Sequence, residues 1–261
     1  MTSDTTARLP LVEPLPEGVR LFHIGPAKTG TTSLQAAAAA TRPQLLAHGV
    51  LYPGQARSQR DAVAAFLGRS LQYNRARPGE ALAAPSLEPW TRMLAEVSAH
   101  PGRAWFGHEY AAGATPAQVA GFAEAIGAGL HVAVTLRSFT RMLPSIWQEY
   151  NKAGNTTSFD GFVKRMFAVE PERRAEVKFH IRHDHAALVR RWAEAVGVPN
   201  VTVVIADRRD HSFTMNAFED LLGLPRDLLA SAEIPPRASN RTMSAAEIEF
   251  VRQVNKRLRE V

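Results

Sequence analysis

The stretch His23-Ile-Gly-Pro-Ala-Lys-Thr-Gly-Thr-Thr-Ser33 decides the fold of this chain, because it joins two segments of different character. Residues 21–24 form a short apolar run that ends in Gly-Pro, which is typical of a buried strand. Residues 31–40 are rich in helix formers and end in five consecutive alanines. We therefore predict that the chain opens with a strand, a loop and a helix.

The loop inside this stretch has the composition of an anion-binding site. Gly25 and Gly30 let the backbone turn tightly, so that several amides can point into one concave site. The N-terminus of the following helix adds its positive dipole end, and Lys28 adds a mobile cation. Hydroxyl donors are supplied by Thr29, Thr31, Thr32 and Ser33. Such a loop is suited to phosphate or sulfate.

The loop differs from the standard loop of proteins that bind nucleoside triphosphates. That loop places its lysine directly after the second glycine and before Ser or Thr, whereas Lys28 comes two residues before Gly30. The hydroxyl that would hold magnesium is therefore out of register with the lysine. The alternative is a glycine-rich turn that binds nothing, but a lysine and four hydroxyls serve no obvious packing purpose.

Strands and helices alternate over most of the remaining chain. Short apolar runs predict buried strands at residues 103–107, 132–136 and 201–205. Helical patterns lie at residues 44–52, 90–98, 141–152, 159–167, 183–196, 244–259 and from 115 on, with an irregular connection at 71–90. The alternation predicts a three-layer α/β fold of P-loop-like type, with a central, mostly parallel sheet flanked by helices.

The length of 261 residues fits one domain. We expect residues 1–18 to be a disordered N-terminal lead-in and residues 19–261 to form the domain. The lead-in lacks the basic start and apolar run of a secretory signal, and no apolar stretch approaches the roughly 20 residues that a membrane span needs. We therefore expect a cytoplasmic protein without a membrane span.

The composition restricts the chemistry further. The sequence has no cysteine, which excludes disulfides, thiolate catalysis and cysteine-ligated metals. The formal net charge of +6 suggests an anionic partner, although an Arg-rich composition alone would also produce it. No predicted helix has a run of basic residues interleaved with aromatic ones, so we expect no nucleic-acid partner.

The segment Pro26-Ala-Lys-Thr-Gly-Thr-Thr32 resembles the donor loop of the sulfotransferases that use 3′-phosphoadenosine-5′-phosphosulfate (PAPS). The resemblance implies that Lys28 contacts the bridging oxygen and the transferring group. It also implies a cradle for the donor's 5′-phosphate, made by Thr29, Gly30, Thr31 and Thr32.

A second element is similar to the same family. Its members have a strand that ends in Arg, with a Ser eight residues later in the next helix, and both residues bind the donor's 3′-phosphate. Here residues 132–136 are followed by Arg137, and Ser145 lies eight residues later. The chain departs from the family at Ser138-Phe139, where Asp-Pro is common. The alternatives are a surface arginine and an ordinary helix serine.

The resemblance extends in outline over residues 21–259, as in bacterial members, but only these two elements are specific. It implies an enzyme that transfers a sulfuryl group by in-line displacement from PAPS, as co-substrate, to a hydroxyl or amine. No metal is expected. The sequence does not identify the acceptor, a small molecule or a carbohydrate, or the oligomeric state.

Sulfuryl transfer also needs a general base that removes the acceptor's proton. The predicted strand at residues 103–107 is followed by His108 and Glu109, and its carboxyl end should open onto the same crevice as Lys28 and Arg137. The resemblance favours Glu109, because many carbohydrate-type members have a Glu at the end of this strand. His108 is the alternative, since an imidazole titrates near neutral pH; a third possibility is that neither residue faces the site.

Two other functions remain open. A nucleotide-dependent phosphotransferase with a variant phosphate loop would need an acidic residue for magnesium, and Asp207 after the predicted strand at 201–205 is the candidate. A non-catalytic polyanion binder would follow from the net charge. His180, His183 and His185 form a cluster, but they do not align on one face, so we expect no metal there.

Overall fold

The structure is a computed structural model of the chain and describes residues 10–71, 85–207, 209–210, 212–234 and 243–259. The strands are β1 (Arg20–His23), β2 (Val50–Leu51), β3 (Arg103–Phe106), β4 (Leu130–Leu136) and β5 (Val201–Ile205). The helices are α1 (Thr31–Ala40), α2 (Arg42–Ala47), α3 (Arg60–Phe66), α4 (Glu88–Ala99), α5 (Pro116–Ile126), α6 (Phe139–Lys152), α7 (Phe159–Phe167), α8 (Lys178–His183), α9 (His185–Val196), α10 (Phe213–Leu222) and α11 (Ala245–Arg259). The described residues also contain the 3-10 helices η1 (Glu109–Gly113), η2 (Pro171–Glu176) and η3 (Val198–Asn200).

The five strands form one sheet in the order β2-β3-β1-β4-β5, and every neighbouring pair is parallel. The predicted sheet is therefore confirmed and is parallel throughout the described residues. In the register of the central strand, Phe22 lies beside Phe106 on one side and beside Val132 on the other. This register aligns the carboxyl ends of β1, β3 and β4 at one edge.

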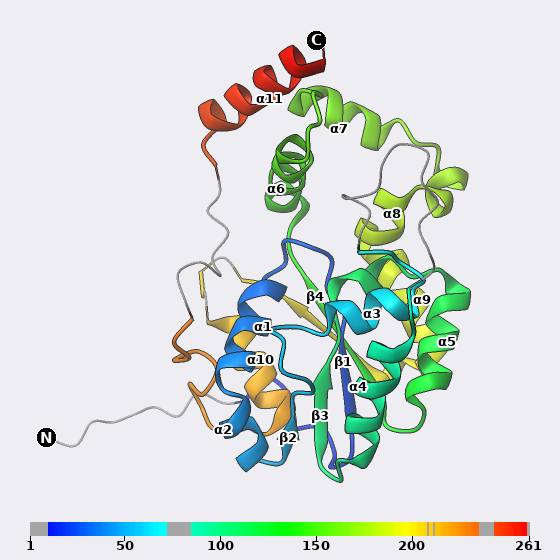
Figure 1. The fold of residues 1–261 in the computed structure, drawn as a ribbon, viewed down its shortest axis with the longest axis vertical. Helices are drawn as coiled ribbons and strands as arrows, with labels where there is room; N and C mark the ends of the chain where they lie inside the picture. The colour runs from blue at the N-terminus through cyan, green and yellow to red at the C-terminus, as the bar shows by residue number, and fades with distance from the viewer. Residues whose placement is uncertain (1–9, 72–84, 208, 211, 235–242, 260–261) are drawn as a thin grey trace, which may run out of the picture.

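Helices cover both faces of the sheet, as expected for a three-layer α/β fold (Figure 1). Because side chains alternate along a strand, neighbours on β1 belong to different cores. Phe22 packs with residues of α3, α4, α5 and α9, whereas Leu21 packs with residues of α1, α2 and α10. Both side chains are fully buried.

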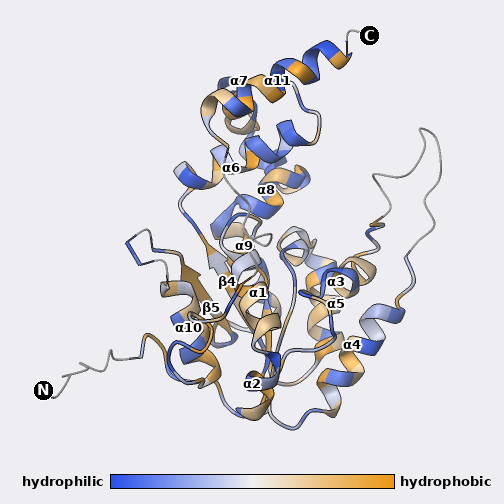
Figure 2. Cartoon of the chain, turned by 60° about the vertical axis from the view of Figure 1, so that its left-hand side comes forward, coloured by the Kyte–Doolittle hydropathy of each residue, from blue (hydrophilic) through white to orange (hydrophobic). Residues whose placement is uncertain are grey.

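A further group of helices, α6, α7, α8 and α11, lies beyond the carboxyl ends of the strands (Figures 1 and 2). It has its own small core, in which Met142 of α6, Phe162 of α7 and Phe179 of α8 are buried. The amide of Asn255 on α11 donates a hydrogen bond of 2.7 Å to the carbonyl of Asn151 on α6. These helices therefore stand over the edge of the sheet where the loops of β1, β3 and β4 emerge.

The chain leaves β1 and β4 in opposite directions. The connection after β1 leads to β2 at one edge, and the connection after β4 leads to β5 at the other. In open α/β sheets the loops diverge at such a point, and a ligand crevice forms outside the carboxyl ends of the two strands. The topology therefore places the crevice between the loop that follows His23 and the segment that follows Leu136.

Two predicted boundaries differ from the structure because local signals end one helix early and start another late. The helix expected at residues 44–52 is α2, which ends at Ala47; Gly49 turns the backbone with φ 74° and leads into β2. The helix expected at 183–196 begins at His185, because the carboxylate of Asp184 caps it by accepting from the amide of Ala187 at 3.0 Å.

The strand expected at residues 201–205 exists as β5, but it is buried on one face only, where Val204 is 5% exposed. It lies at the edge of the sheet beside β4, and the side chains of Val203 and Ile205 are 38% and 62% exposed. An apolar run predicts a strand covered on both faces, but it does not distinguish a central strand from an edge strand.

The expectation of a disordered lead-in differs from the structure from residue 10 on. The amide of Leu11 donates to the carboxylate of Asp220 at 2.7 Å, and the amide of Leu15 donates to the carbonyl of Leu221 at 2.9 Å. Val12 and Leu15 pack against the core beneath α10. Residues 1–9 lie outside the described part of the chain, as do residues 72–84 of the expected irregular connection.

Other predicted elements are confirmed. The strands at 103–107 and 132–136 and the helix at 159–167 are β3, β4 and α7. Thr115 and Ser244 both form the expected N-terminal caps, each with a side chain three residues later that bonds back to the cap. Helix α3 follows a segment that the sequence left unassigned.

The crossing of the β1 loop and β4 leaves no room for a side chain at Gly25. A Cβ atom at this position would lie 1.9 Å from Oγ1 of Thr135 and 2.8 Å from Oγ1 of Thr29. Neither atom is the free end of a flexible side chain, because Thr29 and Thr135 are both buried. Gly25 is therefore required for the close approach of the loop to β4.

We predict that Gly25→Ala lowers the free energy of unfolding by about 2 kcal/mol or more, because the new methyl group forces the loop away from β4. Urea unfolding followed by circular dichroism measures this. Gly121→Ala in α5 is the matched control: its Cβ meets Phe66 at an ordinary 3.4 Å, so the change should be neutral or stabilising by up to about 1 kcal/mol. Equal stabilities of the two variants would contradict the close approach.

Candidate functional site

The loop after β1 makes a tight turn. Lys28 has φ 73° and Gly30 has φ 95°, so two residues adopt left-handed conformations within three positions. Gly30 is the residue that precedes α1, and Thr31 and Thr32 form the first turn of that helix. Their amides have no intrahelical acceptor and point out of the helix end. The predicted loop geometry is therefore present.

Hydrogen bonds fix this loop to the central strands. Oγ1 of Thr29 donates to the carbonyl of Pro26 at 2.8 Å and lies 2.9 Å from Oγ1 of Thr135 on β4. Nε2 of His23 lies 3.2 Å from the same Thr135 oxygen. Thr135 is completely buried, so this polar group holds the loop and the two central strands together inside the protein.

His23 is a structural residue beneath the loop. Burial lowers the pKa of its imidazole from 6.5 to about 3, and the nearby His108 contributes in the same direction. A neutral ring can share a hydrogen bond with Thr135 and pack edge-on against Phe218 at 4.8 Å. His23 on β1 is therefore a buried, neutral residue that is hydrogen-bonded to Thr135 on β4.

Arg137 follows β4 directly and reaches back to the loop. Its Nη1 donates a hydrogen bond of 3.3 Å to the carbonyl of Lys28. Burial lowers the pKa of Arg137, and the guanidinium of Arg141, one turn into α6, lowers it further. Two cations therefore lie close enough to repel each other. An anion between them would relieve this repulsion.

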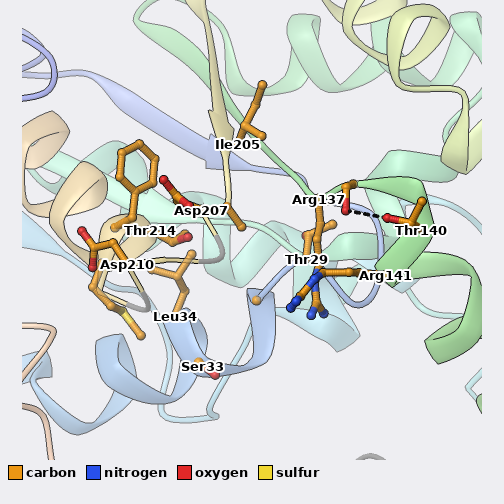
Figure 3. A pocket seen from close by; sticks show the side chains of 15 residues that line it. Thr29, Ser33, Leu34, Arg137, Thr140, Arg141, Ile205, Asp207, Asp210 and Thr214 are labelled. Carbon is orange, nitrogen blue, oxygen red and sulfur yellow. Dashed lines mark hydrogen bonds between the residues drawn. The ribbon is translucent and has the colours of Figure 1, made fainter.

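A cavity of about 620 Å³ lies at this point, between α1, β4, α6, β5 and α10. Figure 3 shows the side chains of Arg137 and Arg141 side by side next to Thr29, with Asp207, Asp210 and Thr214 on the other side of the cavity. Its lining includes Gly30 and Ser33 from the predicted loop. The cavity is large enough for a nucleotide and presents both cations and carboxylates to it.

The side chain of Lys28 is held by a residue that the sequence did not reveal. Its Nζ lies 3.0 Å from Oε1 of Glu149 on α6, and the Lys28 side chain is only 18% exposed. Burial disfavours the charged form of Glu149, but hydrogen bonds from Lys152 and Lys28 outweigh it and lower the pKa of the carboxyl. Glu149 lies twelve residues after Arg137, and no sequence motif marks it.

Ser145 lies on α6 between Arg141 and Glu149. Arg141, Ser145 and Glu149 follow one another at four-residue spacing, so they share one face of the helix. Arg141 lines the cavity and Glu149 pairs with Lys28, which directs this face toward the loop. Ser145 itself is partly buried.

The predicted loop hydroxyls fall into two classes. Thr29 and Thr31 are 1% and 2% exposed, and the Thr29 hydroxyl is used within the protein. Thr32 is partly buried and Ser33 is exposed. Because their side chains are buried, Thr29 and Thr31 can contact a bound ligand through their backbone amides more readily than through their hydroxyls.

The two candidate bases lie together at the end of β3. Gly107 brings the chain against β1, since a Cβ there would lie 2.3 Å from the carbonyl oxygen of His23. His108 is 5% exposed, and its Nδ1 accepts a hydrogen bond of 3.2 Å from the amide of Tyr110. Its Nε2 lies 3.5 Å from Oε2 of Glu109.

This arrangement distinguishes the roles of the two residues. Burial lowers the pKa of His108, against an opposing effect of Glu109. In the neutral ring, Nδ1 is an acceptor and Nε2 carries the proton toward Glu109. Oε2 of Glu109 is buried and accepts no hydrogen bond from the residues that the structure describes. Glu109 is the more exposed of the two, with 23% of its side chain accessible against 6% for His108, and neither residue lines the cavity beside Arg137.

The histidines around α8 do not assemble into a metal site. His183 is buried against Phe179, with ring centroids 4.8 Å apart, and His185 packs on Phe139 at the same distance. Within the described ranges, no group of three His, Cys, Asp or Glu side chains could hold a metal ion. In those ranges there is also no helix of the length and hydropathy required to cross a bilayer.

Comparisons with known proteins give a likeness in fold. No family model matches this sequence, and no curated protein matches it. The fold is similar to that of a sulfotransferase from Alicyclobacillus acidocaldarius, with a TM-score of 0.48, 16% identity and coverage of 94% of this chain and 93% of that chain. It is also similar to the sulfotransferase domain of the Synechococcus PCC 7002 olefin synthase, with a TM-score of 0.40, 12% identity and coverage of 97% and 98%. Similarity at this level leaves the function to be argued from the residues of this chain.

The burial of His23 predicts how stability depends on pH. The folded pKa of about 3 lies below the 6.5 of an exposed imidazole, so unfolding takes up a proton at acidic pH. The contribution of His23 is fully present above about pH 6.5 and declines as the pH falls. We expect His23→Gln to flatten this decline by up to about 1.4 kcal/mol per pH unit.

Urea unfolding between pH 7 and pH 4.5 measures the decline for the wild type and the variant. The exposed His48, replaced in His48→Gln, is the matched control. Equal slopes for the wild type and His23→Gln would contradict the neutral, buried state of His23.

Proposed function

We propose that this protein is a sulfotransferase that binds PAPS and transfers its sulfuryl group to a hydroxyl or amine of an acceptor. The observation that carries the proposal is the convergence of the Lys28 loop with Arg137 and Arg141 on one cavity. The donor has a phosphosulfate at its 5′ position and a phosphate at its 3′ position. The cavity offers Arg137 and Arg141 to one of these ends and the loop residues Thr29 and Gly30 to the other.

In this scheme the amides of the loop and of the first turn of α1 bind the 5′-phosphate. Arg137 and Arg141, with Ser145 on the same face of α6, bind the 3′-phosphate. A bound phosphate would offset the repulsion between the two arginines, and a guanidinium is suited to its planar, two-point recognition. Asp207 and Asp210 face the remaining part of the cavity, where the hydroxyl and amino groups of the nucleoside supply hydrogen-bond donors.

The chemical step uses Glu109 and Lys28. The carboxylate of Glu109, whose side chain is 23% exposed, takes the proton of the acceptor while the acceptor oxygen or nitrogen forms a bond to sulfur. The bond between sulfur and the bridging oxygen breaks in line, and 3′-phosphoadenosine-5′-phosphate (PAP) leaves with the negative charge. Lys28 and the loop amides stabilise this charge. Proton, electron pair and leaving group are thereby all accounted for without a metal.

The ion pair between Lys28 and Glu149 gives this scheme a further step. At 3.0 Å from Glu149, Lys28 is directed toward α6. Donor binding would bring a stronger anion to the lysine, which would leave Glu149 to Lys152, the second cation already hydrogen-bonded to it. Glu149 thus holds Lys28 in place before the donor arrives.

One observation favours a second candidate, a magnesium-dependent phosphotransferase. Asp207 and Asp210 both line the cavity, and carboxylates at a strand end are suited to magnesium. Asp207, however, already pairs with Arg209 at 3.3 Å, and the position of Lys28 before Gly30 is wrong for a standard triphosphate loop. Magnesium dependence distinguishes the two functions.

We predict that PAP binds in the absence of magnesium, and more tightly than AMP or ATP. Arg137→Ala should weaken PAP binding about 10- to 100-fold, because it removes charge-assisted hydrogen bonds worth about 1.5–3 kcal/mol. Arg190→Ala, on the exposed face of α9, is the matched control and should bind PAP as the wild type does. Isothermal titration calorimetry measures the affinities of the wild type for PAP, AMP and ATP, and the affinity of each variant for PAP.

Two results would contradict the proposal. A lack of preference for PAP over AMP and ATP would mean that the Lys28 loop serves another anion. Binding of ATP that appears only with magnesium would favour the phosphotransferase.

A further inference from the structure

Two arginines approach the candidate base from different parts of the chain. Arg69, which follows α3, lies over the ring of Tyr110 at 3.8 Å from its centroid. Tyr110 follows Glu109 in η1, and its ring also packs edge-on against His108 at 4.3 Å. Arg69 is therefore held beside the pair formed by His108 and Glu109.

Arg182 reaches η1 from α8 on the other side. Its side chain lies directly over Gly113, where a Cβ atom would meet Nε of Arg182 at 2.7 Å and its Cγ at 3.1 Å. The absence of a side chain at position 113 thus makes room for this arginine. The neighbouring Arg191 is used differently, since its Nη2 donates to the backbone carbonyls of Ala112 and Ile181.

Neither of the two charges has an acidic partner in the part of the chain that the structure describes. Among the residues that the structure describes, no carboxylate lies within 4.0 Å of the guanidinium of Arg69 or Arg182, and neither side chain donates a hydrogen bond. Burial lowers the pKa of Arg182, and repulsion from Arg69 lowers it further. Both side chains are partly buried. Two partly buried cations without a carboxylate partner repel each other and destabilise the protein, and an anion bound between them would remove this repulsion.

Their position connects them to both halves of the proposed reaction. Tyr150, whose phenol interacts electrostatically with Arg182, is the neighbour in sequence of Glu149, the partner of Lys28. Glu109 lies next to Tyr110, on which Arg69 rests. Arg69 thus contacts the residue next to the candidate base, and Arg182 lies near the residue next to the partner of Lys28.

We propose that Arg69 and Arg182 form an anion subsite for the acceptor, so that the substrate is a molecule that already carries a carboxylate, sulfate or phosphate group. The inference rests on the proposed function, because it assigns the subsite to the acceptor of that reaction. The two guanidinium groups bind the anionic group, and the hydroxyl or amine of the same molecule is then presented to Glu109. Neutral acceptors would lack this anchor.

Inorganic sulfate is the probe for the subsite. The wild-type protein, saturated with PAP to fill the donor cavity, is titrated with sodium sulfate by calorimetry at constant ionic strength, with sodium chloride as the balancing salt. Arg69→Met and Arg182→Met keep most of the apolar stem over Tyr110 and Gly113 but remove the charge. Arg190→Met, at an exposed position of α9, is the control. Circular dichroism and PAP affinity show whether each variant is folded.

We expect saturable sulfate binding by the wild type and by Arg190→Met, and at least tenfold weaker binding by both Arg69→Met and Arg182→Met. PAP affinity should be the same in all four proteins. Equal sulfate affinity in all four, or the absence of saturable sulfate binding by the wild type, would overturn the subsite.

The same samples separate this proposal from the one on which it rests. A wild type that fails to bind PAP would remove the donor assignment, and the sulfate titration without nucleotide would then decide the subsite by the same comparison of variants.

Discussion

The hydroxyl of Thr135 on β4 is the interaction on which the rest of the site depends. It lies 2.9 Å from Oγ1 of Thr29 and 3.2 Å from Nε2 of His23, and it occupies the space that a side chain at Gly25 would need. A buried polar group of this kind is costly unless each member is satisfied. Here the satisfied arrangement brings the β1 loop against β4. It also sets the carbonyl of Lys28 within 3.3 Å of Arg137.

Positive charge is concentrated at the edge of the sheet that this contact builds. Arg137 and Arg141 repel each other on one side of α6, and Arg69 and Arg182 repel each other beside η1. Lys28 in the β1 loop is balanced by Glu149. In our proposals a donor with two phosphates supplies the missing charge at the first pair, and an anionic acceptor supplies it at the second. In these proposals, part of the excess of basic residues binds the two anionic substrates at this edge of the sheet.

The features that the sequence predicted are those that neighbouring residues determine. The loop with Gly25, Lys28 and Gly30 and the strand that ends at Arg137 follow from local composition and spacing, and the parallel sheet follows from the alternation of elements. The edge position of β5 and the start of α9 at His185 were missed. The first depends on the order of strands in space, and the second depends on one capping side chain, Asp184.

The residues missed at the site depend on tertiary contacts. The role of Glu149 follows only from the structure, in which α6 places its carboxylate 3.0 Å from Nζ of Lys28. Arg182 lies more than 70 residues from Tyr110 in sequence, and its role follows from the space over Gly113. The division of the loop hydroxyls into buried and open ones likewise depends on packing against Thr135. The family resemblance supplied roles for residues in the motifs, but it could not supply these partners.

The central claim is that the β1 loop and the end of β4 form one donor site, and the most direct measurement is a crystal structure of the protein with PAP. The account predicts the 5′-phosphate at the N-terminus of α1, within hydrogen-bond distance of the amides of Gly30 and Thr31. It also predicts the 3′-phosphate between Arg137 and Arg141, with Lys28 released from Glu149. Nucleotide bound elsewhere, or bound here with the 3′-phosphate away from Arg137, would contradict it.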